Sequence, residues 1–407
     1  MNQRLVPFST YVVKIVSRCN LNCSYCYMYN LEDQTYRNQP GRMKLDVAAK
    51  MAERIRSHSE KHGRLSMHII LHGGEPLLAG MEHLHEWLAV VREGLGPNLR
   101  GYFSMQSNGV LVTDEWIDFL AEHNVGIGIS YDGPKYMHDR FRLHHDGRGS
   151  YDEVIAGIER LNKHPRGKEI FSTVMSVVDV DLDPHEAWAD FKKLGVYGFD
   201  FSLPHSNHLH PPREGKWTYR DWLITLFDLW FDDPEPHGLR YFENILRTLF
   251  CFPHSSDNIG GKPSGVLVIE TNGDYEGTDA LKCTEEGMSK LGHNVMTDEI
   301  DTLYQYPLVA RLQQANVPLC DTCQACPASE VCGGGYVPHR YHSKTDGVLM
   351  PGFDNPTVYC DALYGLVEHA YYRVRETLPE QWLDKIDSTL AEPVPVDFAE
   401  KEAANVS

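Results

Sequence analysis

Short apolar segments alternate with longer segments of helical periodicity along the first half of the chain. β-branched and apolar runs predict six buried strands, at residues 11–16, 67–71, 102–106, 125–130, 170–177 and 198–203. Apolar positions at helical spacing predict the helices between them, at residues 46–59, 82–92, from 113, 150–162 and 184–194. This alternation predicts βα units and a parallel sheet, in the form of an open doubly wound sheet or a partial barrel.

Polar and glycine-rich stretches directly follow four of these predicted strands. They are Cys19–Cys26, Gly73-Gly74-Glu75-Pro76, Ser107-Asn108-Gly109 and Ser130-Tyr131-Asp132-Gly133. In both kinds of parallel sheet, ligands bind at the carboxyl ends of the strands. We therefore expect these stretches to line one shared active site.

The pattern changes near residue 235. A helix with core-facing aromatic residues is predicted at 217–231, and beyond Pro234 long periodic segments give way to more glycine, proline and cysteine. Val266–Glu270 followed by Thr271-Asn272-Gly273 predicts a hairpin, because Asn-Gly supplies the positive φ angles of a tight turn. After a helix near 363–376, the acidic tail from Glu392 is low in large apolar residues and is expected to be mobile. The predicted divisions are 1–235, 236–370 and 371–407.

Composition restricts the partners and the compartment. The 407 residues carry a formal net charge of −19, which argues against nucleic acid and anionic membrane surfaces as partners. No apolar run approaches the length of about 20 residues that a transmembrane helix needs, and residues 1–7 lack the regions of a signal peptide. We expect a cytoplasmic protein, in which structural disulfides are rare. Of its ten cysteines, eight lie in or near two groups, which indicates metal or cluster ligation.

The first cysteine group is Cys19, Cys23 and Cys26, with the spacing C-x3-C-x2-C. Three thiolates this close together can hold three irons of a four-iron cluster and leave the fourth iron open for another ligand. A zinc ion with a distant fourth ligand is the alternative.

Together with Tyr25, the Gly73–Pro76 stretch and the six βα units, this group resembles the radical S-adenosylmethionine (radical SAM) enzymes, over about residues 8–235. The resemblance implies a partial (β/α)6 barrel in which Cys19, Cys23 and Cys26 ligate a [4Fe-4S] cluster. The open iron of the cluster binds the amino and carboxylate groups of SAM. One electron from an external reductant, of flavodoxin or ferredoxin type, then splits SAM to a 5′-deoxyadenosyl radical.

The same resemblance implies a set of SAM contacts. It places Tyr25 near the adenine, Gly73, Gly74 and Glu75 at the SAM amino group, Asn108, Ser130 and Asp132 near the ribose and methionine, and Arg142 on the carboxylate. Glycines let the backbone approach a ligand closely, and an arginine fork matches a carboxylate. Arg140 lies close to Arg142 in the sequence and competes for the same role.

The second cysteine group is Cys320-x2-Cys323-x2-Cys326-x5-Cys332, with Cys360 further along. Cys323, Cys326, Cys332 and Cys360 supply enough thiolates for a fully ligated four-iron cluster or a zinc ion. Beside a radical SAM domain, this pattern resembles the SPASM-type domain, which carries auxiliary clusters, over roughly residues 250–365. Tyr336 stands where the full pattern often has a further cysteine.

Cys283 and Cys320, together with Cys251, are the candidates for a second auxiliary cluster. The alternative is that Cys251 and Cys283 are ordinary buried thiols.

The stretches around the second group resemble SPASM maturases of ribosomally made peptides, and in particular the branch that forms cyclophanes. They are Glu270–Glu276, Asp279–Lys282, Gly333–Tyr341 and Gly352–Cys360. In that branch the adenosyl radical removes a β-hydrogen from a precursor peptide, the carbon radical adds to an aromatic ring, and an auxiliary cluster accepts the surplus electron. Asp279 resembles a base or ligand position of that branch. His205, which follows a predicted strand, is a candidate proton donor or substrate contact.

Other functions use the same parts. Thioether formation, epimerisation and oxidation of a sulfatase residue to formylglycine are the enzymatic alternatives. An iron–sulfur electron carrier or a zinc-stapled scaffold is the non-enzymatic alternative, although neither needs the SAM-site stretch Gly73–Pro76.

Overall fold

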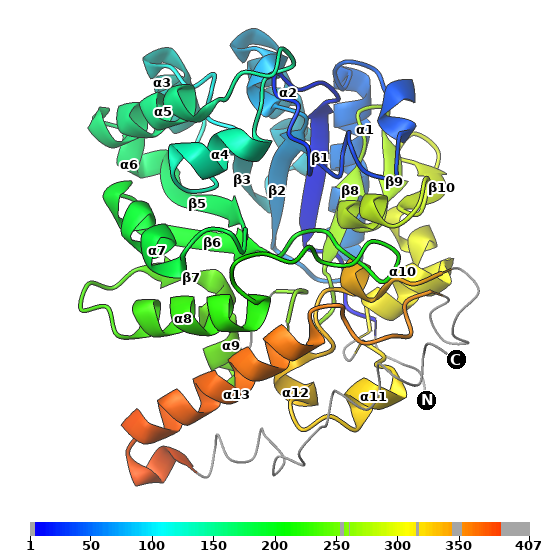
Figure 1. Ribbon diagram of the computed structural model, residues 1–407. Coiled ribbons are helices and arrows are strands. Elements are labelled where there is room, and N and C mark those ends of the chain that lie inside the picture. Colours follow the sequence, from blue (N-terminus) through cyan, green and yellow to red (C-terminus); the bar gives the residue numbers. More distant parts are fainter. Residues whose placement is uncertain (1–4, 253–255, 260, 315–316, 344–351, 384–407) are drawn as a thin grey trace.

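The computed structural model describes residues 5–252, 256–259, 261–314, 317–343 and 352–383. Its centre is one sheet of ten strands, in the order β10-β9-β8-β1-β2-β3-β4-β5-β6-β7 (Figure 1). The strands are β1 Thr10–Val16, β2 Ser66–Gly73, β3 Arg100–Ser107, β4 Val125–Ser130, β5 Phe171–Val177, β6 Gly198–Ser202, β7 Gly238–Leu239, β8 Val266–Ile269, β9 Asp274–Glu276 and β10 Lys290–Asn294. β1 to β7 pair in parallel, as the alternation of strands and helices predicts.

Helices connect and cover these strands. They are α1 Leu45–Lys61, α2 Met81–Leu95, α3 Asp114–Glu122, α4 Lys135–Phe141, α5 Tyr151–Lys163, α6 Gly167–Ile170, α7 Pro184–Lys193, α8 Tyr219–Phe231, α9 Arg240–Leu249, α10 Pro307–Leu312, α11 Asp321–Gln324, α12 Ser329–Cys332 and α13 Cys360–Thr377. The 3-10 helices are η1 Thr35–Asn38, η2 Pro76–Ala79, η3 Asp279–Cys283, η4 Ile300–Gln305, η5 Val337–Arg340 and η6 Glu380–Trp382. Each helix predicted from periodicity is present, and the additions to the prediction are α4, α6, α9, α10, α11 and α12.

Local chemistry explains where several helices begin. The Thr113 side chain accepts a hydrogen bond from the Trp116 amide at 3.3 Å and so caps α3. Asp183 caps α7 in the same way through the His185 amide at 2.8 Å, and Pro184 occupies the first turn of that helix. These side chains pair with backbone amides that the first turn of a helix leaves unbonded, and so they fix where α3 and α7 begin.

The division expected near residue 235 does not separate the sheet. β7 pairs with β6, and β8 returns to pair in parallel with β1, so residues beyond 235 form one edge strand and extend the opposite edge. The predicted hairpin is confirmed, because β8 and β9 are antiparallel and Gly273 has a φ of 89°. The cysteine-rich helices α11 and α12 lie below the sheet in Figure 1, and α13 packs along α8. The acidic tail lies outside the described residues.

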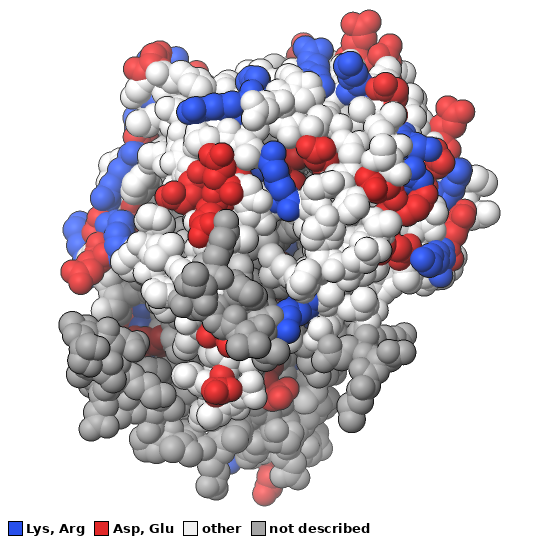
Figure 2. Space-filling model, turned by 90° about the vertical axis from the view of Figure 1, so that its right-hand side faces the viewer, with Lys and Arg blue, Asp and Glu red and all other residues white. Residues whose placement is uncertain are grey.

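The surface and the helices can be compared with the predictions about nucleic-acid and membrane partners. On the face shown in Figure 2, basic and acidic side chains are interspersed and no broad basic patch is seen. Within the described residues, no helix is long and apolar enough to cross a membrane.

Candidate active site

The carboxyl ends of the parallel strands open into a cavity of about 340 Å³. The predicted site residues that line it are Cys19, Cys23, Tyr25, Cys26, Gly73, Gly74, Asn108, Ser130, Asp132, Arg142, His205 and Asp279. Further lining residues, which the sequence analysis does not assign to the site, include Tyr27, Gln106, Met175, Tyr336 and His339. The structure thus brings together residues that are 320 positions apart in the sequence, counted from Cys19 to His339.

The three cysteines of the first group lie on one loop directly after β1. The Leu21 amide points to the Cys19 sulfur at 3.4 Å. Burial raises the pKa of Cys19 to about 12 and that of Cys26 to about 11, so without a cation these groups are neutral thiols. A bound metal would stabilise the thiolates instead. Three sulfur donors on one loop at the wall of a cavity fit a three-cysteine iron–sulfur cluster.

Gly73 and Gly74 lie where the ends of β1 and β2 come closest. A Cβ atom on Gly73 would lie 1.9 Å from the Val16 carbonyl oxygen, and one on Gly74 would lie 2.0 Å from that of Arg18. Gly73 also has a φ of 132°, which L side chains rarely adopt. Only glycine therefore fits at these two positions, and their backbone is left bare at the cavity wall.

Glu75 takes part in a buried hydrogen-bond network next to the cavity. Its buried carboxylate does not line the cavity, and it accepts hydrogen bonds from the Asn108 amide at 2.8 Å, the Ser107 hydroxyl at 2.9 Å and the Leu77 amide at 3.1 Å. Glu75 thus fixes the end of β3 and holds Asn108 at the rim. The predicted contact between Glu75 and the SAM amino group stays a prediction.

Tyr25, Asp132 and Arg142 form one hydrogen-bonded chain at the cavity wall. Arg142 Nη1 donates to the Tyr25 hydroxyl oxygen at 2.7 Å, and this hydroxyl donates to Asp132. Arg142 Nε is buried without a hydrogen-bond partner among the described residues. Arg140 points elsewhere and pairs with Asp181 at 2.8 Å. The geometry therefore favours Arg142 over Arg140 as the group that meets a carboxylate in the cavity.

Asp279 is held ionised at the cavity wall by two partners that the sequence analysis missed. The Lys14 ammonium donates to the carboxylate, and the Tyr27 hydroxyl donates to it at 2.9 Å. Burial alone would raise the pKa of Asp279, but the Lys14 charge outweighs burial and holds that pKa well below its usual range. A lysine inside the otherwise apolar strand 11–16 was the signal that could have revealed this pair.

His72 completes the surroundings of Lys14. Its Nδ1 lies 2.9 Å from Lys14 Nζ, and burial lowers the pKa of His72 to about 3. The ring is therefore neutral and accepts a hydrogen bond from the lysine. The Lys14 ammonium thus donates one hydrogen bond to the Asp279 carboxylate and another to His72 Nδ1.

His205 lies on the same wall, beside aromatic rings. Burial lowers the pKa of His205 to about 4, and its Nδ1 has no hydrogen-bond partner among the described residues. The Tyr27 ring meets it edge-on, with 4.9 Å between the ring centres, and the Tyr336 ring lies 6.4 Å away. A neutral imidazole with a free nitrogen is suited to a hydrogen bond with a substrate.

The second cysteine group surrounds a separate cavity of about 160 Å³. Its sulfur-bearing lining residues are Cys323, Cys326, Cys332 and Cys360. Gly333, Gly334 and Gly335 all have positive φ, and their carbonyl oxygens accept hydrogen bonds from the buried Arg340 guanidinium. Four cysteines around one cavity fit a fully ligated four-iron cluster.

The structure gives no support to a second auxiliary cluster on Cys283 and Cys320. The Cys320 thiolate accepts a hydrogen bond from the Cys323 thiol, which lowers the pKa of Cys320 to about 6, so Cys320 belongs to the group already described. Cys283 is buried in η3, and its pKa is raised to about 12 by burial and not by a neighbouring thiol. Cys251 is exposed. In the described part of the chain, these three cysteines do not converge.

Tyr336 occupies the position at which the full pattern often has a cysteine. It lines the main cavity, and its hydroxyl lies 3.3 Å from that of Thr278. Tyr336 is therefore part of the wall of the active-site cavity.

Comparisons with known proteins agree with this geometry. Residues 13–178 match the family model described as the Radical SAM superfamily. The chain is 26% identical to a cysteine-type anaerobic sulfatase-maturating enzyme of Clostridium perfringens, over 90% of this chain and 97% of that protein. It is 27% identical to a serine-type anaerobic sulfatase-maturating enzyme of Klebsiella pneumoniae, over 82% of each chain.

Solved structures are also similar to this chain. The structure titled "Native anSMEcpe with bound AdoMet" covers 90% of this chain and 98% of its own, with a TM-score of 0.76 and 25% identity. A further structure of that protein holds AdoMet and the Cp18Cys peptide, with a TM-score of 0.75. Streptococcus suis SuiB bound to the precursor peptide SuiA has a TM-score of 0.56 at 17% identity, which shows a shared fold alone. The predicted fold class is confirmed, and these relatives do not support the cyclophane-forming branch.

Proposed function

We infer that this chain, whose residues 13–178 match the radical SAM superfamily, is a radical SAM enzyme that oxidises the β-carbon of one residue in a peptide or protein substrate. The observation that carries the proposal is the position of Asp279. This ionised carboxylate lines the same cavity as the three cysteines of the first group. A radical that removes a hydrogen atom and a carboxylate that removes a proton can therefore act on the same substrate side chain.

The predicted cofactors have matching residues in this chain. Cys19, Cys23 and Cys26 would hold the [4Fe-4S] cluster that SAM binds, and the four cysteines of the second cavity would hold one auxiliary cluster. When bound, these groups supply hydrogen-atom abstraction from the substrate and acceptance of one electron. The flavodoxin- or ferredoxin-type reductant stays a prediction.

The protein's own residues then have separate tasks. The bare backbone at Gly73 and Gly74 allows SAM to approach closely, and Arg142 is placed to pair with its carboxylate. Lys14 and Tyr27 keep Asp279 ionised, so its carboxylate can accept a proton after hydrogen-atom removal, when the substrate O–H or S–H next to the radical carbon is far more acidic. Burial of this pair excludes bulk water and so strengthens the electrostatic interaction.

Oxidation of a cysteine or serine side chain to formylglycine is the first candidate outcome. It is supported by sulfatase-maturating relatives that match nearly their whole length. In this reaction the substrate hydroxyl or thiol must lose a proton, and the Asp279 carboxylate is the ionised group available at the cavity.

A crosslink between an aromatic ring and a β-carbon is the second candidate outcome. The aromatic wall of Tyr27, His205 and Tyr336 favours it, because edge-on ring contacts suit an aromatic substrate side chain. Asp279 would then remove the proton that the ring loses when aromaticity is restored.

One experiment separates these outcomes. The enzyme is co-expressed anaerobically with two substrates, a sulfatase-type peptide that contains cysteine or serine and a peptide encoded beside this protein. A product that reacts with an aldehyde reagent establishes formylglycine. Loss of two hydrogens without aldehyde reactivity, located between an aromatic residue and a neighbour, establishes the crosslink. If both peptides stay unchanged while SAM is cleaved, the proposed peptide oxidation is overturned for these substrates.

A further inference from the structure

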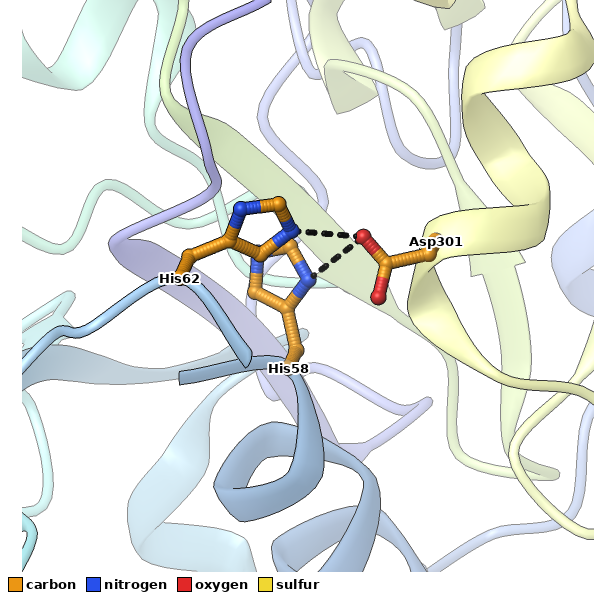
Figure 3. Close-up of side chains that lie close together, drawn as sticks. All are labelled: His58, His62 and Asp301. Atoms are coloured by element: carbon orange, nitrogen blue, oxygen red, sulfur yellow. Dashed lines mark hydrogen bonds and ion pairs between the residues drawn. The ribbon is translucent and has the colours of Figure 1, made fainter. Parts of the chain in front are cut away.

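A second group of candidate metal ligands lies away from the active-site cavity. His58 lies in the last turn of α1, and His62 is the C-cap residue that follows the helix. The two residues are four positions apart, about one helical turn, so their side chains lie on the same side of the helix end. Asp301 of η4 faces both rings (Figure 3). Its Oδ1 lies 2.7 Å from His62 Nε2 and 3.4 Å from His58 Nδ1.

His58 is the unusual member of this group. It is 1% exposed, and neither of its ring nitrogens has a hydrogen-bond partner among the described residues. Its approach to Asp301 is close but lacks the alignment of a hydrogen bond. Buried polar groups are normally paired, and leaving one unpaired costs free energy. In the part of the chain that the structure describes, the buried His58 ring has no hydrogen bond and only this ion-pair contact with Asp301, which points to a missing ligand.

We propose that His58, His62 and Asp301 bind a divalent transition-metal cation, with zinc as the preferred ion. Two imidazoles and one carboxylate form a common zinc donor set, with zinc–ligand distances of about 2.0–2.2 Å. The three ligand atoms already lie within 4.8 Å of one another, and His62 and Asp301 are partly exposed, so a water molecule can complete the tetrahedron.

The carboxylate of Asp301 has one oxygen free to face the rings. Lys61 pairs with Asp301 Oδ2 at 3.3 Å, which leaves Oδ1 directed at the two rings.

Asp233, Glu235 and His237 also lie close together, but they are a poorer candidate for a metal site. Asp233 already accepts hydrogen bonds from Lys192 at 2.8 Å and from the Trp188 indole at 2.9 Å.

The position of the site indicates a structural role. His62 comes just before Ser66, the first residue of β2, whereas the active-site cavity lies at the opposite, carboxyl ends of the strands. Asp301 belongs to the segment that follows β10, which also contacts α1 through Arg54 and the Val295 carbonyl at 3.0 Å. A bound ion would join the first helix of the barrel to this later segment.

The test uses the full chain with its iron–sulfur clusters loaded, because vacant cysteines would themselves bind zinc. The protein is equilibrated anaerobically with zinc ions alone, and bound zinc is counted. We compare wild type with His62→Ala, a partly exposed position whose change should not prevent folding, and with Asp301→Asn. His85→Ala is the matched control, because His85 lies 3.2 Å from His123 on the surface without a neighbouring carboxylate in the same group.

We expect wild type and His85→Ala to bind one more zinc ion than His62→Ala and Asp301→Asn. Loss of an outer-shell partner alone weakens metal binding about 10–100-fold, so loss of a ligand should weaken it by at least about 100-fold. The zinc absorption edge should report nitrogen and oxygen ligands, and zinc should raise the melting temperature of wild type more than that of His62→Ala. Equal zinc content in wild type and His62→Ala, or sulfur ligands alone, would overturn the proposal. Neither result depends on activity, so failure here leaves the proposed peptide oxidation intact.

Discussion

At the scale of single residues, the Asp279 carboxylate is the most specific feature of the cavity. We expect Asp279→Asn to slow product formation by at least about 100-fold, because general-base catalysis contributes roughly 10²–10⁴-fold. SAM cleavage without product should continue, since the Asp279 carboxylate is hydrogen-bonded to Lys14 and Tyr27 and has no hydrogen bond to Gly73 or Gly74 among the described residues. The measurement is the ratio of modified peptide to 5′-deoxyadenosine. Asp146→Asn, on an exposed loop, is the control. Unchanged coupling in Asp279→Asn would refute the base role.

Arg142 and Arg140 provide a matched pair for the SAM carboxylate. Arg142→Lys should raise the KM for SAM by roughly tenfold or more, because a lysine loses the forked geometry that matches a carboxylate. Arg140→Lys should leave the KM nearly unchanged, since this side chain pairs with Asp181 outside the cavity. Initial rates of SAM cleavage at varied SAM concentration measure both values. The opposite order of the two KM values would transfer the role to Arg140.

The sequence was informative about residues whose chemistry is local. The cysteine spacing and the glycine pair predicted their own positions at the cavity, since adjacent residues share one loop. The partners of Asp279 could not be predicted, because Lys14 lies 265 positions away from it and only the fold brings them together. The role of Glu75 was also hidden, since its carboxylate turns back to Ser107 and Asn108 instead of facing the cavity.

At the scale of elements, strand and helix periodicity predicted the barrel closely, but it missed α4. This short helix matters because it carries His138 and ends next to Arg142. The Asp132 amide donates to His138 Nδ1 at 3.3 Å, and His138 Nε2 lies 3.2 Å from the Ser150 hydroxyl. Ser150 in turn donates to the Arg142 carbonyl at 2.7 Å. A neutral His138 thus holds Asp132 and Arg142 in place.

This network predicts a pH dependence of stability. Burial lowers the pKa of His138 from 6.5 to about 2, so the unfolded chain binds this proton more readily than the folded chain. The stabilisation is therefore full above pH 6.5 and is lost as pH falls from 6.5 towards 2. For this residue we expect a loss of about 1.4 kcal/mol in the free energy of unfolding between pH 7.5 and 5.5.

Denaturant unfolding of wild type and His138→Gln at the two pH values tests this expectation. Glutamine keeps an acceptor and a donor but does not titrate, so the variant should lose about 1.4 kcal/mol less than wild type over the same interval. An equal loss in both proteins would show that His138 does not titrate differently in the folded and unfolded chains.

At the scale of the whole molecule, the sequence divided what the fold joins. A boundary near residue 235 follows from composition, yet β8 pairs with β1 and places Asp279 opposite Lys14. Pairing between strands this far apart in the sequence depends on the order of the strands in the whole sheet, which no local pattern reports. The same limit applies to the cysteines, because spacing alone did not separate Cys320 from Cys283.

The arrangement of cysteines predicts the iron content of the whole enzyme. One three-cysteine site and one four-cysteine site imply about eight irons in each chain, whereas a second auxiliary cluster would bring the total to about twelve. Cys283→Ala should keep about eight irons, because Cys283 does not belong to the described group around the second cavity. Cys326→Ala should hold about four irons and cleave SAM without forming product, and Cys23→Ala should not cleave SAM.

Iron and sulfide analysis of anaerobically reconstituted protein, together with product mass, measures these values. A content of about twelve irons that falls in Cys283→Ala would establish the second auxiliary cluster and contradict the arrangement described here. Full product from Cys326→Ala would remove the auxiliary cluster from the reaction, and the surplus electron would then need another acceptor. The expected result is about eight irons in both wild type and Cys283→Ala, and SAM cleavage without product in Cys326→Ala. This result would assign the role of electron acceptor to the cluster of the second cysteine group, in the cavity of about 160 Å³.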